Sequence, residues 1–410
     1  MKISTVKGTN DYLPEQVALR DYLQSVILTT YEDAGFSRIS TPAIEDIENL
    51  DKSDGGENLN LIFKILKRGE KLESALRSGN EKDLADMGLR YDLTLPLSRY
   101  YANNRSHLSL PAKCIQMDKV YRAERPQKGR LREFVQCDID IIGSSSILCE
   151  IELIGTTAKA LLAIGMKDFT VKVNDRRILR AMLEKMGFAP EDLDGVCIVF
   201  DKLDKVGVDG VRAELLEKGY SAEAVENLCA ALSAGEMSLE KVAALLPENP
   251  AVQSVSSILT AAQALADGRY GVRFDLSLVR GQGYYTGTVF EVESNEFHGA
   301  IAGGGRYDNL IGKFTGETVP AVGFSIGFER IFGILSDAGF AAPKRKERIA
   351  LFCEEKDATQ AAALAESLRA SYAVSVLERP KKLGKALQRL QDGGYAGYLV
   401  FGEGTEVKRF

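Results

Sequence analysis

The residue types best suited to chemistry gather in one short segment, VYRAERPQKGRLREFVQ, which runs from Val120 to Gln136. It holds four arginines and one lysine around a single phenylalanine, Phe134. An arginine is a permanently charged planar fork that matches phosphate oxygens two at a time, and an aromatic ring offers a stacking face for a base. The segment therefore predicts a nucleotide polyphosphate site. The composition fits a second interpretation equally well, a solvated hairpin in which Glu124 and Glu133 neutralise their neighbours.

Three further segments carry groups of the same kind. VRGQGYYTGTVFEV places Arg280 before a glycine pair, and glycines let a backbone lie close against a ligand. Its flanks have the pattern of strands, so it is not a dinucleotide-binding turn, and a glycine-rich β-hairpin is the alternative. GGGRYD contributes Arg306 and Asp308 to a predicted ligand-facing loop, or else to a tight turn. GFSIGFERI places Arg330 at the start of a helix, where it faces either a site or the surface.

The sequence argues against several other kinds of site. Its six cysteines form no CxxC pair and its two histidines, His107 and His298, are far apart, which argues against a metal site, a disulfide framework or a Ser-His-Asp relay. The absence of an apolar run of roughly 20 residues and of an N-terminal signal core predicts a cytoplasmic protein with no membrane span. The net charge of -6 argues against general coating of nucleic acid but permits a local basic groove.

The elements that must position these groups alternate between helices and strands. A helical pattern over 16–34 leads into an extended segment, and Pro42 within that segment indicates a strand edge or end. Two strand-like runs, 112–124 and 132–142, predict a long antiparallel hairpin that carries the arginines along its strands and loop. The β-rich segments that hold the other motifs are expected to complete the same antiparallel sheet.

A chain of 410 residues should divide into two or three domains. Residues 187–266 are rich in Ala, Leu, Glu and Lys and predict a helical insertion within a first domain, which we place at 1–335. A linker with a basic run follows at 336–347. The alternating strands and helices of 348–410 predict a small C-terminal α/β domain. The predicted fold class is α+β.

Taken together, the motifs resemble those of the histidyl-tRNA synthetases, a family of class II aminoacyl-tRNA synthetases. GFSRISTPAIE, VYRAERPQKGRLREF and GFSIGFERI are similar to the three motifs that define the class. VRGQGYYTGTVFE and GGGRYD are similar to two stretches that mark the histidine-specific branch, and the five occur in the family's order. The resemblance extends over nearly the whole chain and implies a class II antiparallel sheet flanked by helices, a homodimer with the first motif at its interface, and anticodon binding by the C-terminal domain.

The resemblance also implies a reaction. L-histidine and ATP would form histidyl-adenylate and pyrophosphate, after which tRNA(His) accepts the histidyl group. Mg²⁺ is expected with the ATP. Arg122 and Arg280 would be the catalytic residues, because preorganised cations stabilise the charge that develops at the α-phosphate.

The resemblance further assigns substrate contacts. Histidine brings donors, its ammonium and its imidazole, so its pocket should offer acceptors. Isosteric apolar side chains would leave those acceptors unpaired and be rejected. The residues expected at ATP are Arg122, Glu124, Arg130, Arg132, Phe134 and Arg330. Those expected at histidine are Asp92, Leu93, Thr94, Arg122, Gln136, Asp140, Arg280, Tyr284 and Tyr285.

The sequence departs from the family at two places. Gln282 and Gly283 stand where many members have Leu-Asp, so the role of that aspartate is not carried over. The C-terminal domain is shorter than the family pattern, which bears on anticodon contacts. The alternative function is that of the synthetase-like regulatory subunits of ATP phosphoribosyltransferase, which bind histidine without activating it. Those subunits typically lose the catalytic arginines and the C-terminal domain, both of which this chain keeps.

Overall fold

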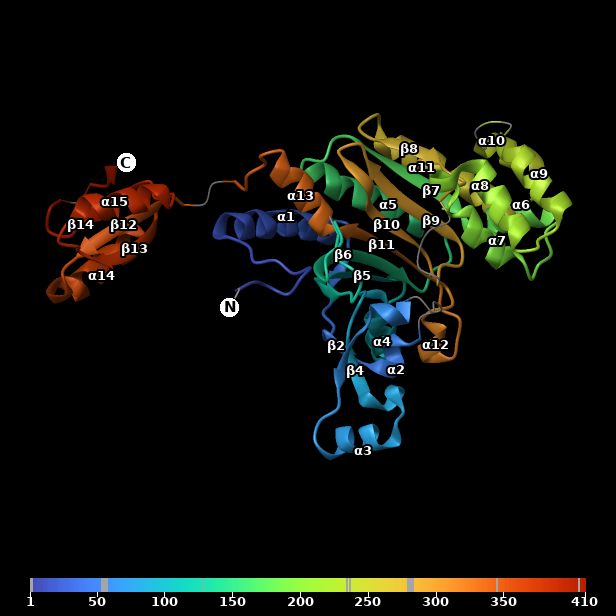
Figure 1. Ribbon diagram of the computed structural model, residues 1–410. Helices are drawn as coiled ribbons and strands as arrows, with labels where there is room; N and C mark the ends of the chain where they lie inside the picture. Colours follow the sequence, from blue (N-terminus) through green and yellow to red (C-terminus); the bar gives the residue numbers. More distant parts are fainter. Residues whose placement is uncertain are drawn as a thin grey trace. The chain divides into compact units, whose positions relative to one another are not determined.

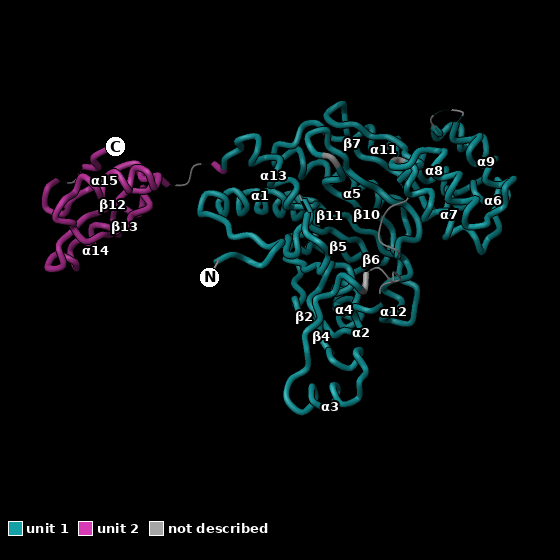
Figure 2. The backbone as a smooth tube through the Cα atoms, in the orientation of Figure 1, with its two compact units in different colours: residues 1–341 teal, residues 342–410 magenta. Residues whose placement is uncertain are grey.

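The computed structural model describes residues 3–52, 58–127, 129–233, 235, 237–278, 284–343, 346–404 and 406–410, apart from the side chains of Asp204 and His298. The chain forms two compact units, Met1–Ala341 and Ala342–Phe410 (Figure 2). Over the described ranges, no helix is long and apolar enough to cross a membrane.

A large sheet lies at the centre of the first unit (Figure 1). Within the described residues it has eight strands in the order β1-β5-β6-β11-β10-β9-β7-β8. Neighbouring strands run antiparallel except for β1 with β5 and β7 with β8. The strands are β1 (Ser37–Arg38), β5 (Ala112–Tyr121), β6 (Glu133–Ile142), β7 (Phe169–Asp175), β8 (Gly271–Phe274), β9 (Thr288–Ser294), β10 (Phe297–Arg306) and β11 (Ala321–Gly327).

Strand β6 shows why the sheet has one apolar and one polar face. Successive side chains of a strand point to opposite faces, so residues two apart share a face. The odd-numbered side chains Val135, Cys137, Ile139 and Ile141 belong to the main hydrophobic core. The even-numbered side chains, from Phe134 to Asp140, lie on the other face and include a glutamine and two aspartates.

Helices cover the apolar face of this sheet (Figure 1). They are α1 (Pro14–Asp33), α5 (Leu148–Ala163), α11 (Pro250–Ala266) and α13 (Phe328–Asp337). Helix α1 begins with Pro14, which suits a first turn, and Gly35 follows it with a φ of 81°. Its buried side chains, including Leu19, Leu23 and Ile27, pack into the main core. The helix predicted over 16–34 is therefore confirmed.

A small sheet stands beside the polar face, and the sequence patterns did not indicate it. Within the described residues it contains β2 (Ile44–Asp46), β4 (Ala85–Leu89) and β3 (Phe63–Leu66) in that order. Pro42 precedes it and lies outside the strands. The helices and turns of this region are α2 (Ile47–Leu50), η1 (Asn58–Leu61), α3 (Glu70–Ser78), η2 (Glu81–Leu84), α4 (Thr94–Asn104) and η3 (Arg105–His107).

The segment between β7 and β8 is helical, as its composition predicts. Together with α11 it comprises α6 (Arg176–Lys185), α7 (Leu193–Phe200), α8 (Leu203–Glu217), α9 (Ala222–Ser233) and α10 (Leu239–Leu245). A short helix, α12 (Gly312–Thr315), lies between β10 and β11.

The second unit is a small α/β layer structure. Its sheet has the order β13-β12-β14-β15 in the described residues, with β12, β13 and β14 parallel. Side chains of α14 and α15 pack in two separate clusters against the sheet. Its elements are β12 (Arg348–Cys353), η4 (Glu355–Asp357), α14 (Ala358–Leu368), β13 (Ala373–Glu378), α15 (Leu383–Asp392), β14 (Gly397–Val400) and β15 (Lys408–Arg409). The α+β fold class is confirmed.

Candidate active site

A cavity of about 470 Å³ opens on the polar face of the large sheet. Strand β6 and the segment that connects β5 to it, the segment before β9, the strands β9 to β11, the start of α13 and the region at the start of α4 contribute its walls. It brings together most of the residues that the sequence predicts for ATP and histidine. These are Asp92, Thr94, Arg122, Glu124, Arg130, Phe134, Gln136, Asp140, Tyr284, Tyr285 and Arg330.

The remaining predicted residues lie elsewhere. Leu93 is buried beside the cavity, where its carbonyl accepts a 2.8 Å hydrogen bond from Gln116 Nε2. Arg132 donates from Nε to the carbonyl of Glu124 at 3.2 Å and from Nη1 to that of Lys7 at 3.4 Å. Arg132 therefore supports the backbone of two neighbouring segments, whereas Leu93 is itself held through its carbonyl by Gln116. Arg280 falls outside the described residues.

One end of the cavity is cationic. Arg122 donates from Nε to the carbonyl of Tyr91 at 3.0 Å, and its guanidinium carbon lies 4.9 Å from the ring centre of Phe134. Arg330 donates to the carbonyl of Ala300. Burial lowers the pKa of Arg330, and the nearby charges of Arg130 and Arg122 lower it further. Three guanidinium groups thus act on one another at this end, an arrangement suited to a polyanion.

The salt-bridged alternative accounts for only part of this end. Glu133 pairs with Lys119 at 2.7 Å on β5, outside the cavity lining. Glu124 pairs with the exposed Arg130 at 3.5 Å, and both remain at the cavity wall. The strands are also shorter than predicted: β5 ends at Tyr121, and the chain makes its turn before β6 begins. All four arginines consequently lie on the connecting segment.

The other end of the cavity is acidic. Leu95 N–H donates to Asp92 Oδ1 at 3.3 Å, and Tyr307 Oη donates to Asp140 Oδ1 at 2.5 Å. Burial raises the pKa of Asp92 to about 6 and that of Asp140 to about 7, with the charge of Asp92 contributing to the second shift. Tyr284 donates to Thr94 Oγ1 at 3.3 Å. A cationic ligand here would favour ionisation of both carboxyls.

Three polar residues of this end were missed by the sequence reasoning: Asp138, Tyr307 and Ser325. Burial, and then the charge of Asp140, raise the pKa of Asp138 well above its usual value. The alternation along β6 was the available signal, because Asp138 lies between Gln136 and Asp140 on the same face. Tyr307 and Ser325 carried no such signal, since their positions depend on the pairing of β11 with β6 and of β10 with β11.

Glycines shape the floor of the cavity by admitting close neighbours. Gly323 of β11 is paired with Asp140, and a Cβ at Gly323 would lie 2.0 Å from Asp140 Oδ1. A Cβ at Gly304 of β10 would lie 2.1 Å from the carbonyl oxygen of Gly323 and 2.7 Å from the ring of Phe290. The glycine run of GGGRYD is therefore part of a central strand, and the tight turn considered for it is wrong.

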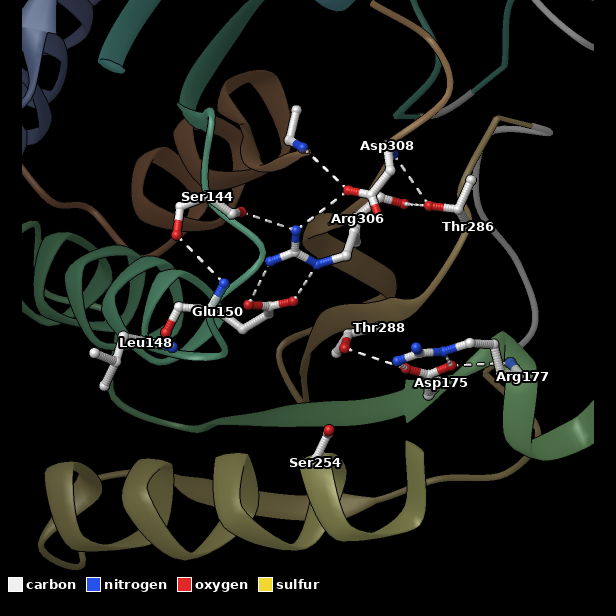
Figure 3. Close-up of polar contacts among 12 residues, drawn as sticks. Ser144, Leu148, Glu150, Asp175, Arg177, Ser254, Thr286, Thr288, Arg306 and Asp308 are labelled. Carbon is white, nitrogen blue, oxygen red and sulfur yellow. Dashed lines mark hydrogen bonds and ion pairs between the residues drawn. The ribbon is translucent and has the colours of Figure 1, made fainter. Parts of the chain in front are cut away.

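Arg306 does not face a ligand, which corrects the prediction for the GGGRYD segment. Its guanidinium donates to both carboxylate oxygens of Glu150 at 2.7 and 2.9 Å, and also to Asp308 Oδ1 at 3.2 Å (Figure 3). Arg306 and Glu150 are buried and lie outside the cavity lining. Asp308 Oδ1 also accepts from the N–H of Ala321 at 3.1 Å, so this cluster ties α5 to the segment between β10 and β11.

A second polar cluster holds the backbone on both sides of residues 279–283. The buried Asn174 donates from Nδ2 to the carbonyls of Leu276 and Leu278, at 3.1 and 3.2 Å. Arg176 donates from Nη1 to the carbonyl of Tyr285 at 3.0 Å. Between these two residues Asp175 caps α6 and accepts from Thr288 (Figure 3). The end of β7 therefore anchors the flanks of the segment that contains Arg280.

The family model for histidyl-tRNA synthetase matches residues 8–331, which include every element that lines the cavity. The chain belongs to the histidyl-tRNA synthetase family. A histidine–tRNA ligase of Leifsonia xyli subsp. xyli is 44% identical over 353 residues, which are 83% of this chain and 82% of the relative. The family resemblance drawn from the motifs is thus confirmed.

Solved structures agree with the family's fold. The crystal structure of histidyl-tRNA synthetase from Nostoc sp. PCC 7120 matches with a TM-score of 0.78 and 28% identity, over 97% of this chain and 91% of that one. An ATP phosphoribosyltransferase regulatory subunit/histidyl-tRNA synthetase from Bacillus halodurans C matches with a TM-score of 0.79 over 98% of each chain, at 22% identity. The second match shows the fold alone, so fold by itself does not separate a synthetase from a regulator.

Proposed function

We propose that this protein is a histidine–tRNA ligase, which activates L-histidine with ATP to histidyl-adenylate and transfers histidine to tRNA(His). The observation that carries the proposal is one cavity whose two ends have opposite chemistry. Guanidinium groups and an aromatic ring lie at one end, and buried carboxyls lie at the other. Membership of the family and the 44% identity to a named ligase favour activation over histidine binding alone.

The cationic end suits ATP. Phe134 offers its ring to the adenine base, and Arg122, Arg130 and Arg330 offer charge-assisted donors to the phosphates. Glu124, held beside Arg130, would accept from the adenine amino group or fix the connecting segment. Arg132 contributes indirectly in this proposal, because it donates to the Glu124 carbonyl.

The acidic end suits histidine. The ammonium and the ring N–H are donors, and Asp92, Gln136 and Asp140 present acceptors to them. Tyr284 and Tyr285 form an aromatic wall, with ring centres 5.2 Å apart. Leu93 would act through its backbone, which Gln116 holds in place. An apolar side chain of similar shape would leave the buried acceptors unpaired and be rejected.

The reaction joins the two ends. An oxygen of the histidine carboxylate attacks the α-phosphorus of ATP, a phosphorus–oxygen bond forms, and pyrophosphate leaves. Arg122 belongs to the cationic end, and its charge also acts on Asp92 of the acidic end, so it would stabilise the charge on the α-phosphate together with Arg280 in our proposal. Asn174 and Arg176, which hold the flanks of residues 279–283, would support Arg280 indirectly.

Magnesium fits the cationic end as a companion of ATP. Mg²⁺ is bound through one or two carboxylates and substrate phosphates while keeping several waters. Glu291 lines the cavity close enough to Arg330 to raise the pKa of that guanidinium, and Glu124 lines the same end. Because Glu124 is assigned to the adenine or to the connecting segment, Glu291 would hold the ion together with the phosphates, and the ion would neutralise phosphate charge when bound.

The remaining features of the proposal follow from the family. We place the catalytic domain at 1–335 with its helical insertion at about 187–266, a linker at 336–347 and an anticodon-binding domain at 348–410. We also expect a homodimer in the cytoplasm.

The test is histidine-dependent exchange of labelled pyrophosphate into ATP. The proposal predicts exchange in the unmutated protein and a loss of roughly 10²–10³-fold in Arg280→Ala. Histidine binding without exchange would instead identify a regulatory subunit. Undiminished exchange in the variant would remove Arg280 from its role and leave the activity standing.

A further inference from the structure

We propose that Asp138 is a positioning residue for histidine, because it holds the side-chain amide of Gln136 with its oxygen toward the ligand. The inference rests on the proposed function, since it concerns the end of the cavity assigned to histidine. Asp138 is buried on β6 and lines that end.

The contacts of Gln136 define the direction of its amide. A glutamine amide has a nearly symmetric shape, with two donors on nitrogen and an acceptor at oxygen. Nε2 lies 3.3 and 3.2 Å from the two carboxyl oxygens of Asp138 and 3.2 Å from Ser325 Oγ. In a reversed amide, the oxygen would face the carboxyl oxygens of Asp138 instead. The carboxyl therefore favours the observed direction.

The register of the sheet places these three groups together. Ser325 of β11 is paired with Asp138 across the β6–β11 ladder, and Gln136 precedes Asp138 by two residues on the same face. The Ser325 hydroxyl lies close enough to Asp138 to lower the pKa of that carboxyl, so the hydroxyl and the carboxyl both lie around the amide nitrogen.

The opposite end of the amide has no such partner. Gln136 Oε1 is buried without a hydrogen bond within the part of the chain that the structure describes, and so is Asp92 Oδ2. Both residues line the cavity. Buried polar atoms in native proteins are nearly always paired, so two unpaired acceptors in one cavity indicate a ligand that brings donors. Histidine brings them as an ammonium and a ring N–H.

The holding action of Asp138 does not require a negative charge. Burial and the charge of Asp140 raise the pKa of Asp138 well above its usual value. A neutral carboxyl still accepts from Gln136 through its carbonyl oxygen and can donate its proton to Ser325 Oγ. Asparagine offers a carbonyl oxygen acceptor and a donor in the same shape as a neutral carboxyl, whereas alanine offers neither group.

The experiment compares Asp138→Asn with Asp138→Ala by calorimetric titration of histidine and of ATP. Asp138→Ala removes the hydrogen bonds that fix the direction of the Gln136 amide, so histidine affinity should fall about tenfold. In Asp138→Asn, histidine affinity should stay within about threefold of that of the unmutated protein. ATP affinity should not change in either. Asp168→Ala removes an exposed aspartate immediately before β7 of the same sheet and is the matched control.

A double-substitution cycle separates positioning from general support. In a Gln136→Ala background the account predicts that Asp138→Ala has no further effect on histidine, because no amide remains to be held. An equal loss in both backgrounds would overturn the proposal. So would an Asp138→Asn variant as weak as Asp138→Ala, since that result would assign the effect to charge.

Two additional measurements keep the test decisive. If Asp138→Ala does not fold, Ser325→Ala removes the other support of the amide and should weaken histidine by about threefold. An unchanged affinity there would also count against the proposal.

Titration of 3-(imidazol-4-yl)propionate, which lacks the ammonium, identifies the group that donates to Gln136 Oε1. If Asp138→Ala leaves the affinity for this analogue unchanged, the donor is the ammonium. If Asp138→Ala weakens the analogue as much as it weakens histidine, the donor is the ring N–H. Failure of the unmutated protein to bind histidine at all would instead refute the proposed function.

Discussion

The two ends of the cavity use opposite means to bind their ligands, although one strand contributes to both. The cationic end has exposed or half-buried guanidinium groups, mostly on connecting segments and at the start of α13. The acidic end has carboxyls that are almost completely buried on or beside the sheet. Strand β6 carries Phe134 at the first end and Asp140 at the second, which are roughly 20 Å apart at the usual rise per residue.

The difference shows how a protein keeps unlike charges from cancelling each other. Guanidinium groups stay charged even when partly buried, so they can remain close together and await a polyanion. Burial raises the pKa of the carboxyls, so they hold protons to a higher pH than usual, and a cationic ligand favours their ionised form. Each end is therefore incomplete without its own substrate.

The largest expected effect comes from Arg122, the arginine of the cationic end whose charge also acts on Asp92 at the acidic end. Arg122→Ala should lower the kcat/KM for pyrophosphate exchange by roughly 10²–10³-fold, because it removes a preorganised cation at the reacting phosphate. Arg122→Lys should recover little, since a lysine lacks the planar fork. Arg212→Ala, which removes an exposed arginine that pairs with Glu226 on the helical segment, is the control and should leave exchange unchanged. Exchange rates that fall equally in Arg122→Ala and Arg212→Ala would contradict the role assigned to Arg122.

A smaller loss is expected when the acidic end is distorted. Gly323→Ala would place a Cβ against Asp140 and displace its carboxyl. Histidine affinity should fall by roughly 10–100-fold, because hydrogen bonds to charged groups contribute about 1.5–3 kcal/mol each. ATP affinity should be kept. Gly333→Ala in α13 adds the same atom where nothing lies within 4 Å and should bind both substrates normally. Binding titrations of the two variants check the prediction, and equal effects on ATP and histidine in Gly323→Ala would contradict it.

The acidic end should also make both stability and histidine affinity depend on pH. The folded chain holds protons on Asp92 and Asp140 up to pKa values of about 6 and about 7, whereas the unfolded chain releases them near 4. Without ligand, the free energy of unfolding due to these groups should therefore fall as the pH rises from about 4 to about 7. Thermal unfolding over this range measures the slope.

Histidine should act in the opposite direction. A cationic ligand favours the ionised carboxyls, so its binding releases protons below their pKa and affinity should rise by up to about tenfold per pH unit for each such carboxyl. Asp140→Asn should flatten the part of both slopes that lies near pH 7. Slopes that are the same in the variant would show that other groups, including the imidazole of the ligand, account for them.

The smallest effect is expected from the hydrogen bonds that hold the residues on either side of 279–283, the segment that contains the proposed catalytic Arg280. Asn174→Ala removes two hydrogen bonds to the backbone before residue 279, and we expect kcat for exchange to fall by about 3–10-fold with little change in the KM for histidine or ATP. Asn295→Ala, which removes an exposed side-chain hydrogen bond to Asp168, is the matched control. In an Arg280→Ala background the Asn174 substitution should add nothing further, and a full additional loss would contradict the supporting role.

The sequence predicted the fold class and most of the cavity because those features depend on local patterns. The alternation along β6 and the arginine-rich segment after β5 are visible in a few consecutive residues. The partners of Arg306 could not be predicted, since Glu150 is distant in sequence and reaches Arg306 only after the sheet has paired. The same reason explains why Tyr307 and Ser325 were missed and why the strands β2, β3 and β4, which pair across long gaps, were not anticipated.

The most direct test of the central claim is a crossed binding experiment on the two ends of the cavity. Arg330→Ala should weaken ATP by about tenfold or more and leave histidine affinity unchanged, since it removes a charged donor from one end only. Asp140→Asn should weaken histidine binding and leave ATP affinity unchanged at pH 8, where the unmutated carboxyl is ionised. Calorimetry that finds both ligands weakened alike in each variant would contradict the division of the cavity into two ends of opposite chemistry.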